Sequence, residues 1–252
     1  MMKKMKRVYK NWLVRITVGF TALLSLRLIS TLLHMTTLER LYKPRDFRRT
    51  HHPEISQDIL DRLPRYCQTI FGQKMDPINL VFIGNEEGIR NAFDEAEWDG
   101  AHPSTPLHLL AGFASSLFSV SYRKGPFMPL FISVGLQDLS FQKVVTGKYA
   151  TRHHIRIWRT RHHIPGNKRV FVAAATYEKS FRVGFRPPFV FHHKDPNLDW
   201  ERDYIVKAMA RLGHHMVGDH AFNTPITSAK PARDPHGDPY YTDGHVKVIE
   251  VS

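Results

Sequence analysis

The sequence feature that most constrains the fold of this chain is an apolar stretch near its N-terminus, at residues 12–35. Its longest segment without a charged residue runs from Ile16 to Leu26, and apolar residues continue beyond Arg27. This length is enough for a helix to span a bilayer, and no small-x-small cleavage site follows. Arg15 can extend its side chain to the near interface, whereas Arg27 lies closer to the middle of the stretch. An arginine at the centre costs roughly 2.5–3.5 kcal/mol on insertion, which the many leucines and isoleucines offset.

A helix lying in the membrane interface is the rival interpretation of the same stretch. Arg15 and Arg27 are twelve positions apart, which places them about 120° apart around a helix, so they do not define one polar face. We therefore expect one uncleaved transmembrane helix over residues 12–35.

The charge of the chain is concentrated around this stretch. Residues 1–50 contain 12 Lys or Arg and two acids, whereas the rest of the chain contains 24 bases and 21 acids. Such flanking bases suit anionic headgroups, while a nucleic-acid-binding protein would carry its charge on the folded part. We expect a membrane as partner and no nucleic acid. The bases on the two sides of the stretch nearly balance, and the tight N-terminal cluster favours a single-pass protein with its domain outside the cytoplasm.

The chain divides into four segments on these grounds. We predict a basic tail at residues 1–11, the anchor at 12–35, a basic juxtamembrane segment at 36–53 and one globular domain at 54–252. One domain is the better expectation for about 200 residues of ordinary composition.

Apolar spacing in the domain alternates between the helical and the extended periods. Helical spacing is found at residues 54–71, 85–96, 104–121 and 197–212, and Pro64 should kink or split the first of these helices. Extended segments are expected at residues 78–84, 127–134, 154–159, 169–177 and 245–251. In the third helix, the residues expected to face inward are Leu107, Leu110, Ala111, Ala114, Leu117 and Phe118. We expect residues 218–242 to form a loop. A turn at residues 165–167 joins two extended segments as a hairpin, and this irregular order predicts an α+β domain with a mixed or antiparallel sheet.

A basic motif, RHHIRIW at residues 152–158, lies in one of these strands. Alternation places His154, Arg156 and Trp158 on one face and His153 on the other. Arg152, His154 and Arg156 together predict a pocket for a phosphate or carboxylate, because guanidinium groups bind both in a bidentate way. The alternative is a solvent-exposed face whose arginines pair with acids from another element.

A second polar motif, QDLSFQK at residues 137–143, is open to two interpretations. Gln137, Asp138, Gln142 and Lys143 could line a pocket for a sugar or a headgroup. A tight connection after a strand, with Asp138 bonded to nearby backbone, accounts for the same residues without a ligand.

Histidines and acids also suggest a metal site. The strongest set for zinc or manganese is His154, His193, Asp195, Asp199 and Glu201. The acids fit two structural roles equally well. In the first role, the acids stabilise the N-terminus of a helix by interacting with its dipole. In the second, Asp199 or Asp203 forms a buried ion pair with Arg152 or Arg156.

The sequence gives no support for nucleophilic catalysis or for nucleotide binding. Cys67 is the single cysteine and fits a small apolar core residue. The chain has no GxSxG, GxxxxGK or GxGxxG motif, so the common nucleophile and nucleotide classes are not expected.

Several segments together resemble the LssY C-terminal domain family. They are INLVFIG at 78–84, AEWDGA around Trp98, GLQDLSFQK at 135–143, RHHIRIW at 152–158, HHKDPNLDWERDYIV at 192–206 and YTDGHVKVIEV at 241–251. They follow the family order over roughly residues 75–251. The resemblance implies a domain found alone or joined to membrane domains of the type-2 phosphatidic acid phosphatase and DedA kinds. It implies no particular activity or catalytic residue.

From these features we predict a membrane-anchored domain of the cell envelope that binds an anionic ligand (a lipid headgroup or glycan) or a partner protein. The alternative is a metal-dependent hydrolase of a phosphorylated or esterified envelope component. The sequence does not decide between an enzyme and a binding domain.

Overall fold

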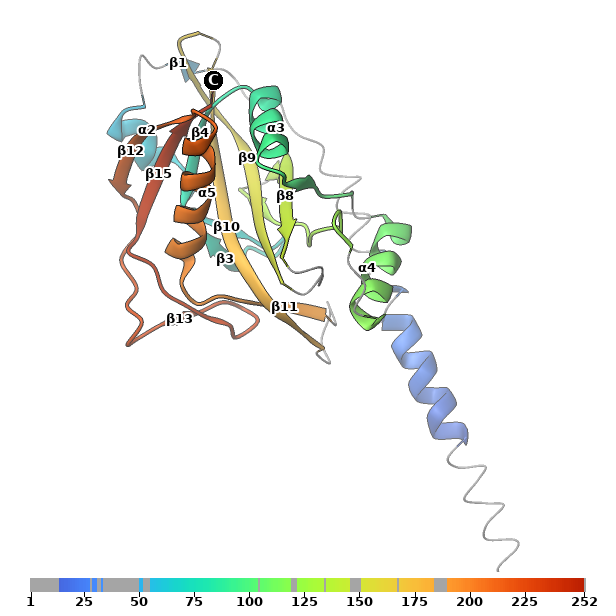
Figure 1. Cartoon of the computed structure of the whole chain (residues 1–252). Coiled ribbons are helices and arrows are strands. Elements are labelled where there is room, and N and C mark those ends of the chain that lie inside the picture. The colour runs from blue at the N-terminus through green and yellow to red at the C-terminus, as the bar shows by residue number, and fades with distance from the viewer. Residues whose placement is uncertain are drawn as a thin grey trace, which may run out of the picture.

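A nine-stranded sheet forms the centre of the protein, shown here by a computed structural model (Figure 1). The structure describes residues 14–27, 29–30, 33, 50–51, 55–103, 105–118, 122–133, 135–145, 151–166, 168–183 and 190–251. Seven strands follow one another in space, in the order β12 (His215–Ala221), β15 (His245–Glu250), β4 (Leu80–Gly84), β10 (Lys168–Val183), β9 (Arg152–Ile164), β8 (Leu139–Val144) and β5 (Asp99–Gly100). Two more strands complete the sheet, because β11 (Val190–Lys194) pairs with β10 and β1 (Thr50–His51) pairs with β9.

The sheet is mixed, as the sequence predicted. β15 pairs with β4 in parallel, and β4 with β10 antiparallel. The predicted hairpin is confirmed as β9 and β10, which extend further than the apolar segments that indicated them. Gly166 in its turn has a φ of 80°, a conformation that a glycine adopts at little cost.

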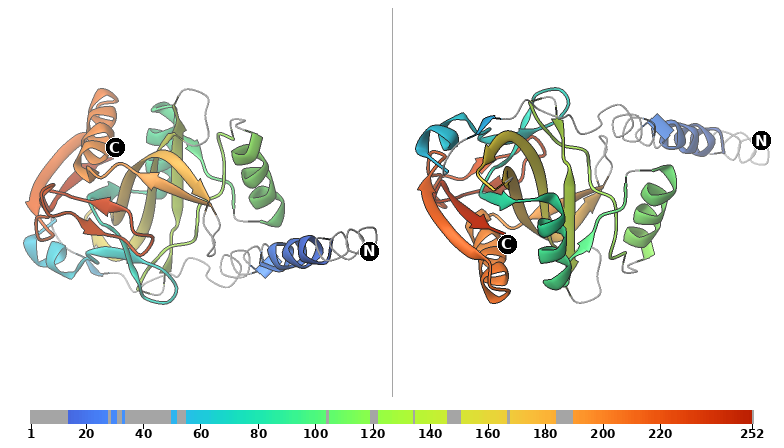
Figure 2. Two further views of the ribbon diagram at one scale, coloured as in Figure 1. Left: turned by 90° about the horizontal axis from the view of Figure 1, so that it is seen from below. Right: turned by 90° about the horizontal axis from the view of Figure 1, so that it is seen from above.

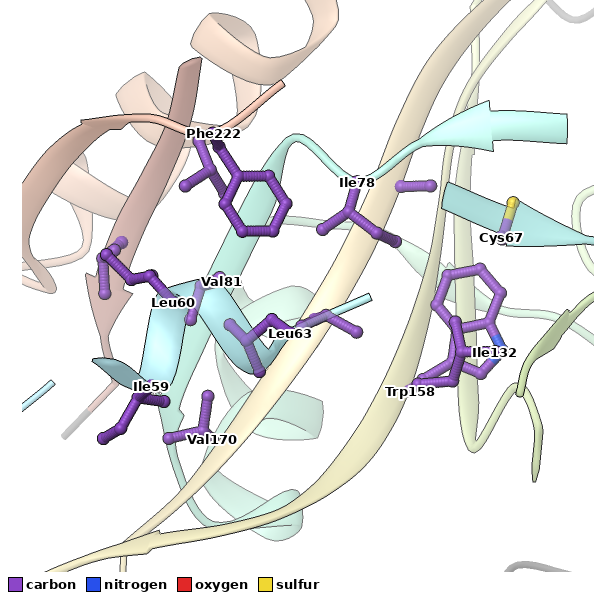
Figure 3. Packing of buried hydrophobic residues seen from close by; sticks show 14 of the residues in the cluster. Ile59, Leu60, Leu63, Cys67, Ile78, Val81, Ile132, Trp158, Val170 and Phe222 are labelled. Atoms are coloured by element: carbon purple, nitrogen blue, oxygen red, sulfur yellow. The ribbon is translucent and has the colours of Figure 1, made fainter. Parts of the chain in front are cut away.

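Both faces of the sheet are buried, which explains the continuous apolar run of β4. Val81 and Ile83 belong to one core cluster, whereas Leu80 and Phe82 belong to the other. Figure 3 shows the first cluster, in which Trp158 of β9 lies near Ile132 and Cys67.

Different elements cover the two faces. α3 (Glu86–Glu95) and α5 (Leu198–Arg211) pack on the second cluster, and Asn85 and Asn197 cap their N-termini. The first cluster is covered by α2 (Gln57–Arg62) and a small sheet. This sheet has the order β3 (Lys74–Pro77), β2 (Tyr66–Gln68), β6 (Phe131–Ile132) and β7 (Gly135–Leu136). Figure 2 shows the layers from two further sides.

Two predicted segments differ from the structure. The helix expected over residues 54–71 ends at Arg62, so the predicted break at Pro64 is confirmed, but the residues after it enter β2 and do not return to a helix. The region expected as a loop, residues 218–242, contains most of β12 and the short pair β13 (Ala232–Arg233) and β14 (Pro239–Tyr240). β12 pairs with β15, a tertiary contact that overrides its polar composition.

The predicted inward face of α4 (Pro106–Phe118) is also wrong. Leu107 is 73% exposed and Leu110 is 45% exposed, and Ala111 and Ala114 are exposed too. Ser115 is buried instead. The side chains of Leu117 and Phe118, which were expected to face inward as well, lie outside the described residues. Among the described side chains of α4, the small and polar Ser115 is thus buried while Leu107 and Leu110 are exposed.

The predicted transmembrane helix is a further correction. Residues 14–27 are helical, and this run includes Arg15 and Arg27. In the part of the chain that the structure describes, no helix is both long and apolar enough to cross a membrane.

The predicted segment boundaries stay predictions. The tail at residues 1–11 and most of the segment at 36–53 lie outside the described residues, which include only β1 of the latter. The location of the protein in the cell likewise stays a prediction.

Candidate functional site

The basic motif of β9 is buried within the fold. Arg152, His154 and Arg156 point to the face that carries Trp158, as the alternation predicted, and each is less than 8% exposed. This strand face is therefore not solvent-exposed. Its arginines nevertheless pair with acids from other elements, as the alternative interpretation expected, Arg152 with Glu178 of β10 and Arg156 with Asp76 of β3. These three side chains begin a chain of polar contacts that runs across the sheet, which we call the buried polar network.

Arg152 is held at both edges of its guanidinium. Its Nε donates to Glu178 Oε2 on β10 and its Nη1 donates to Gln142 Oε1 on β8, each at 2.5 Å. The Phe127 ring lies 5.2 Å from its Cζ. Both polar partners are buried, so Arg152 is a fully compensated charge.

His154 lies between Arg152 and Arg156 on the same face. Its Nε2 accepts from Arg156 Nη1 at 2.9 Å, and its Nδ1 is 3.1 Å from Glu178 Oε1. These partners assign the proton to Nδ1 of a neutral imidazole. Burial lowers the pKa of His154, and the arginines add to this effect against the opposing influence of Glu178.

Arg156 has looser contacts than Arg152. Its Nη1 is 3.8 Å from Asp76 Oδ2, and its Nε has no hydrogen-bond partner among the described residues. The Phe127 ring lies 5.0 Å from its Cζ. A buried guanidinium with an open donor edge is costly in the absence of a partner.

A lysine and two aspartates complete the network. Lys194 Nζ on β11 is 2.6 Å from both Asp76 Oδ1 and Asp234 Oδ2. Burial opposes ionisation of Asp76, but Lys194 and Arg156 outweigh it, so the pKa of Asp76 is lowered. Burial likewise opposes the charge of Lys194, but the same two carboxylates outweigh it and raise the pKa of the lysine.

The network is balanced in charge. Its cations Arg152, Arg156 and Lys194 are matched by Glu178, Asp76 and Asp234. Sequence reasoning missed these last three residues and Lys194, which come from strands and loops distant in the chain. Glu178 lies within β10, Asp76 within β3, Lys194 at the end of β11 and Asp234 directly after β13, so no shared local pattern marks them.

The metal candidates do not converge. His193 Nδ1 is 2.6 Å from Asp238, Asp195 pairs with Lys179, and Asp199 bonds to Arg202 and Thr242. Glu201 lies across the sheet from His154. Among the residues that the structure describes, no three His, Cys, Asp or Glu are grouped to hold a metal. The expected pairing of Asp199 or Asp203 with Arg152 or Arg156 is also wrong, since both aspartates pair with Arg202.

The four candidate residues of the QDLSFQK motif do not line one common pocket but bond to different partners. Gln142 belongs to the network through Arg152. Gln137 accepts from Leu130 N, Asp138 accepts from Arg159 N, and Lys143 donates to Ala96 O. Each of the last three therefore bonds to the backbone of a segment distant in the chain or across a loop, and whether any of them binds a ligand stays a prediction.

A second polar centre lies on the opposite face, under α5. His153 Nδ1 is 2.7 Å from Glu201 Oε2, and Tyr204 stacks on the imidazole at 4.0 Å. Trp200 is nearly parallel to it at 5.8 Å. Glu201 is fully buried and its Oε1 has no hydrogen-bond partner among the described residues, and burial raises its pKa against the opposing effect of His153.

Comparison with protein families agrees with the sequence motifs. The family described as LssY C-terminus matches residues 60–246. The chain belongs to the LssY C-terminal family. The family match includes every member of the buried polar network, so the network lies inside the family domain and not in an appended segment. Neither the curated proteins nor the solved structures gave a match.

Proposed function

We propose that this LssY C-terminal domain binds an anionic group, a phosphate or a carboxylate, of a cell-envelope component at Arg156. The observation that carries the proposal is the incomplete coordination of this guanidinium. It is 7% exposed, its Nε has no partner among the described residues, and Asp76 lies beyond hydrogen-bond distance at 3.8 Å.

The chemistry of Arg156 favours an oxyanion as the missing partner. A guanidinium presents two adjacent N–H donors, which match the spacing of two oxygens on a phosphate or carboxylate. Arg152, four residues earlier, uses its donors on Glu178 and Gln142. Arg156 gives one donor to a neutral histidine, and its ion pair with Asp76 is long, at 3.8 Å.

Nearby groups would tune this site. Asp76 is shared between two cations, because Lys194 Nζ lies 2.6 Å from it. Its negative charge is therefore not available to Arg156 only. Phe127 covers the guanidinium and excludes water from one side, which strengthens its electrostatic attraction for an anion. Lipid headgroups and acidic glycans both carry the required group, and a location in the envelope is proposed from the sequence.

A hydrolase that uses a divalent metal is not favoured by any grouping of side chains among the described residues. The candidate ligands His154 and Glu201 lie on opposite faces of the sheet, and the remaining candidates are occupied by separate ion pairs. We therefore propose that Arg156 binds the anionic group and takes no part in a reaction.

The test is isothermal titration of the full chain with inorganic phosphate, glycerol 3-phosphate and glucuronate. We expect saturable binding of at least one, and the preferred probe separates a phosphate source from a carboxylate source. Arg156→Lys keeps the charge but loses the bidentate geometry, so affinity should fall about tenfold.

Arg159→Lys is the matched control, because Arg159 lies on the same strand and pairs with Glu86 and Asp138 outside the network. Its affinity should equal that of the wild type. Absence of binding to all three probes, or equal losses in the two variants, would overturn the proposal.

A further inference from the structure

The helix α4 exposes an apolar side to the solvent, although a helix that packs only on its own domain would bury such a side. Leu107, Leu110, Ala111 and Ala114 fall within an arc of about 100° around the helix axis, and all four are exposed. A helix of a globular protein normally turns such an arc toward the core.

The opposite side of α4 is fixed by specific contacts. His108 Nδ1 bonds to Pro103 O at 3.0 Å, and its ring stacks on His102 at 4.3 Å. His102 in turn bonds to Tyr122 OH at 3.0 Å. Because Gly112 and Ser115 are buried on this side, the outward turn of the leucines follows from how the helix is attached.

We infer that α4 docks on a lipid bilayer and lies in its interface. The helix has no charged residue over its 13 residues. Its length of about 20 Å is too short to cross the hydrocarbon core of about 30 Å, but suits a helix lying parallel to the membrane. The expected depth is that of the boundary between headgroups and acyl chains.

The surroundings of α4 favour a bilayer as its occupant. In Figures 1 and 2, the helical residues 14–27 lie on the same side of the molecule as α4. They expose further apolar side chains, among them Val18 and Leu23 at 62% and 55%. Lys124, which follows α4, and Arg15 and Arg27 of the helical residues 14–27 are exposed, so anionic headgroups match this side in charge.

The inference does not depend on the anion site at Arg156. The network lies inside the domain, whereas α4 presents a surface. Failure of phosphate or glucuronate to bind leaves the docking of α4 unaffected, and the two proposals have separate readouts.

The test places a single label on α4. Cys67 is fully buried, so an introduced cysteine in the full chain is labelled selectively with a nitrobenzoxadiazole fluorophore. Leu107→Cys and Ala111→Cys report on the exposed arc. Met216→Cys is the matched control, because Met216 is 51% exposed on the edge strand β12.

Vesicles of phosphatidylcholine with phosphatidylglycerol should shift the emission at positions 107 and 111 to the blue. Brominated acyl chains should quench it, with no change at position 216. Equal responses at all three positions, or none at 107 and 111, would overturn the inference. A label at 107 that is already blue-shifted without vesicles would also overturn it. If that shift depended on protein concentration, a second copy of the chain would cover α4. If it did not, a segment of the same chain would cover it.

Discussion

His153 and His154 are neighbours in β9, yet their imidazoles lie on opposite faces of the central sheet. His153 is bonded to Glu201 and stacked on Tyr204, whereas His154 accepts from Arg156 and faces Glu178. Such a doublet cannot give two ligands to one metal. It supplies one polar anchor to each of the two cores, so each half of the domain has its own buried polar centre.

The pair formed by Arg152 and Glu178 should be essential for stability. Glu178→Gln keeps the shape of the side chain but leaves Arg152 as an uncompensated buried charge, so the free energy of unfolding should fall by about 3–5 kcal/mol. Urea denaturation measures this change. Asp58→Asn breaks an exposed pair with Arg62 and should cost less than about 1 kcal/mol. Equal small losses in both variants would show that the buried pair is dispensable.

The neutral state of His154 predicts acid sensitivity. Because its pKa in the folded state is lowered, the unfolded chain takes up the proton first as the pH falls below about 6.5. The wild type should therefore lose stability between pH 7 and pH 5. His154→Gln provides an acceptor for Arg156 and a donor for Glu178 without titrating, so this part of the loss should disappear. His215→Gln, at an exposed histidine, should retain the wild-type slope in urea denaturation at each pH.

Cys67 should be inert in the folded protein. Burial, and secondarily Asp76, raise the pKa of its thiol to about 12, and the side chain is not exposed. Alkylation requires the thiolate, so iodoacetamide should leave the native chain unmodified at pH 8 and modify it in urea. Mass spectrometry distinguishes the two forms. Rapid modification without urea would contradict the packing of Cys67 beside Trp158.

Local patterns predicted the parts of the fold that depend on neighbouring residues. The alternation of β9 correctly placed His154 and Arg156 together, and the turn at Gly166 correctly indicated the hairpin. The partners of these residues could not be found in this way. Lys194 meets Asp76 across 118 positions, and no local spacing encodes the strand order that brings them together.

The error at α4 has a different cause. Helical periodicity identifies Leu107 and Leu110 as members of one face, but it does not say whether the domain offers that face a partner. The transmembrane prediction is also wrong for the described part of the chain, which contains no helix both long and apolar enough to cross a membrane.

Glu201 provides a test of whether the centre under α5 is structural. Its folded-state pKa is raised by burial, so the carboxylate destabilises the folded protein as the pH rises above the unfolded-state value of about 4.3. Glu201→Gln still accepts from His153 but removes the buried charge. The variant should therefore be at least as stable as the wild type at pH 7, and the difference should shrink near pH 4.

Urea denaturation at the two pH values measures this difference, and Asp199→Asn is the comparison within the same helix. Asp199 accepts from Arg202, Thr242 and the Asp243 amide, so its loss should destabilise the chain by about 1–3 kcal/mol at pH 7. A Glu201→Gln variant that is much less stable than the wild type at pH 7 would mean that its charge is needed by His153.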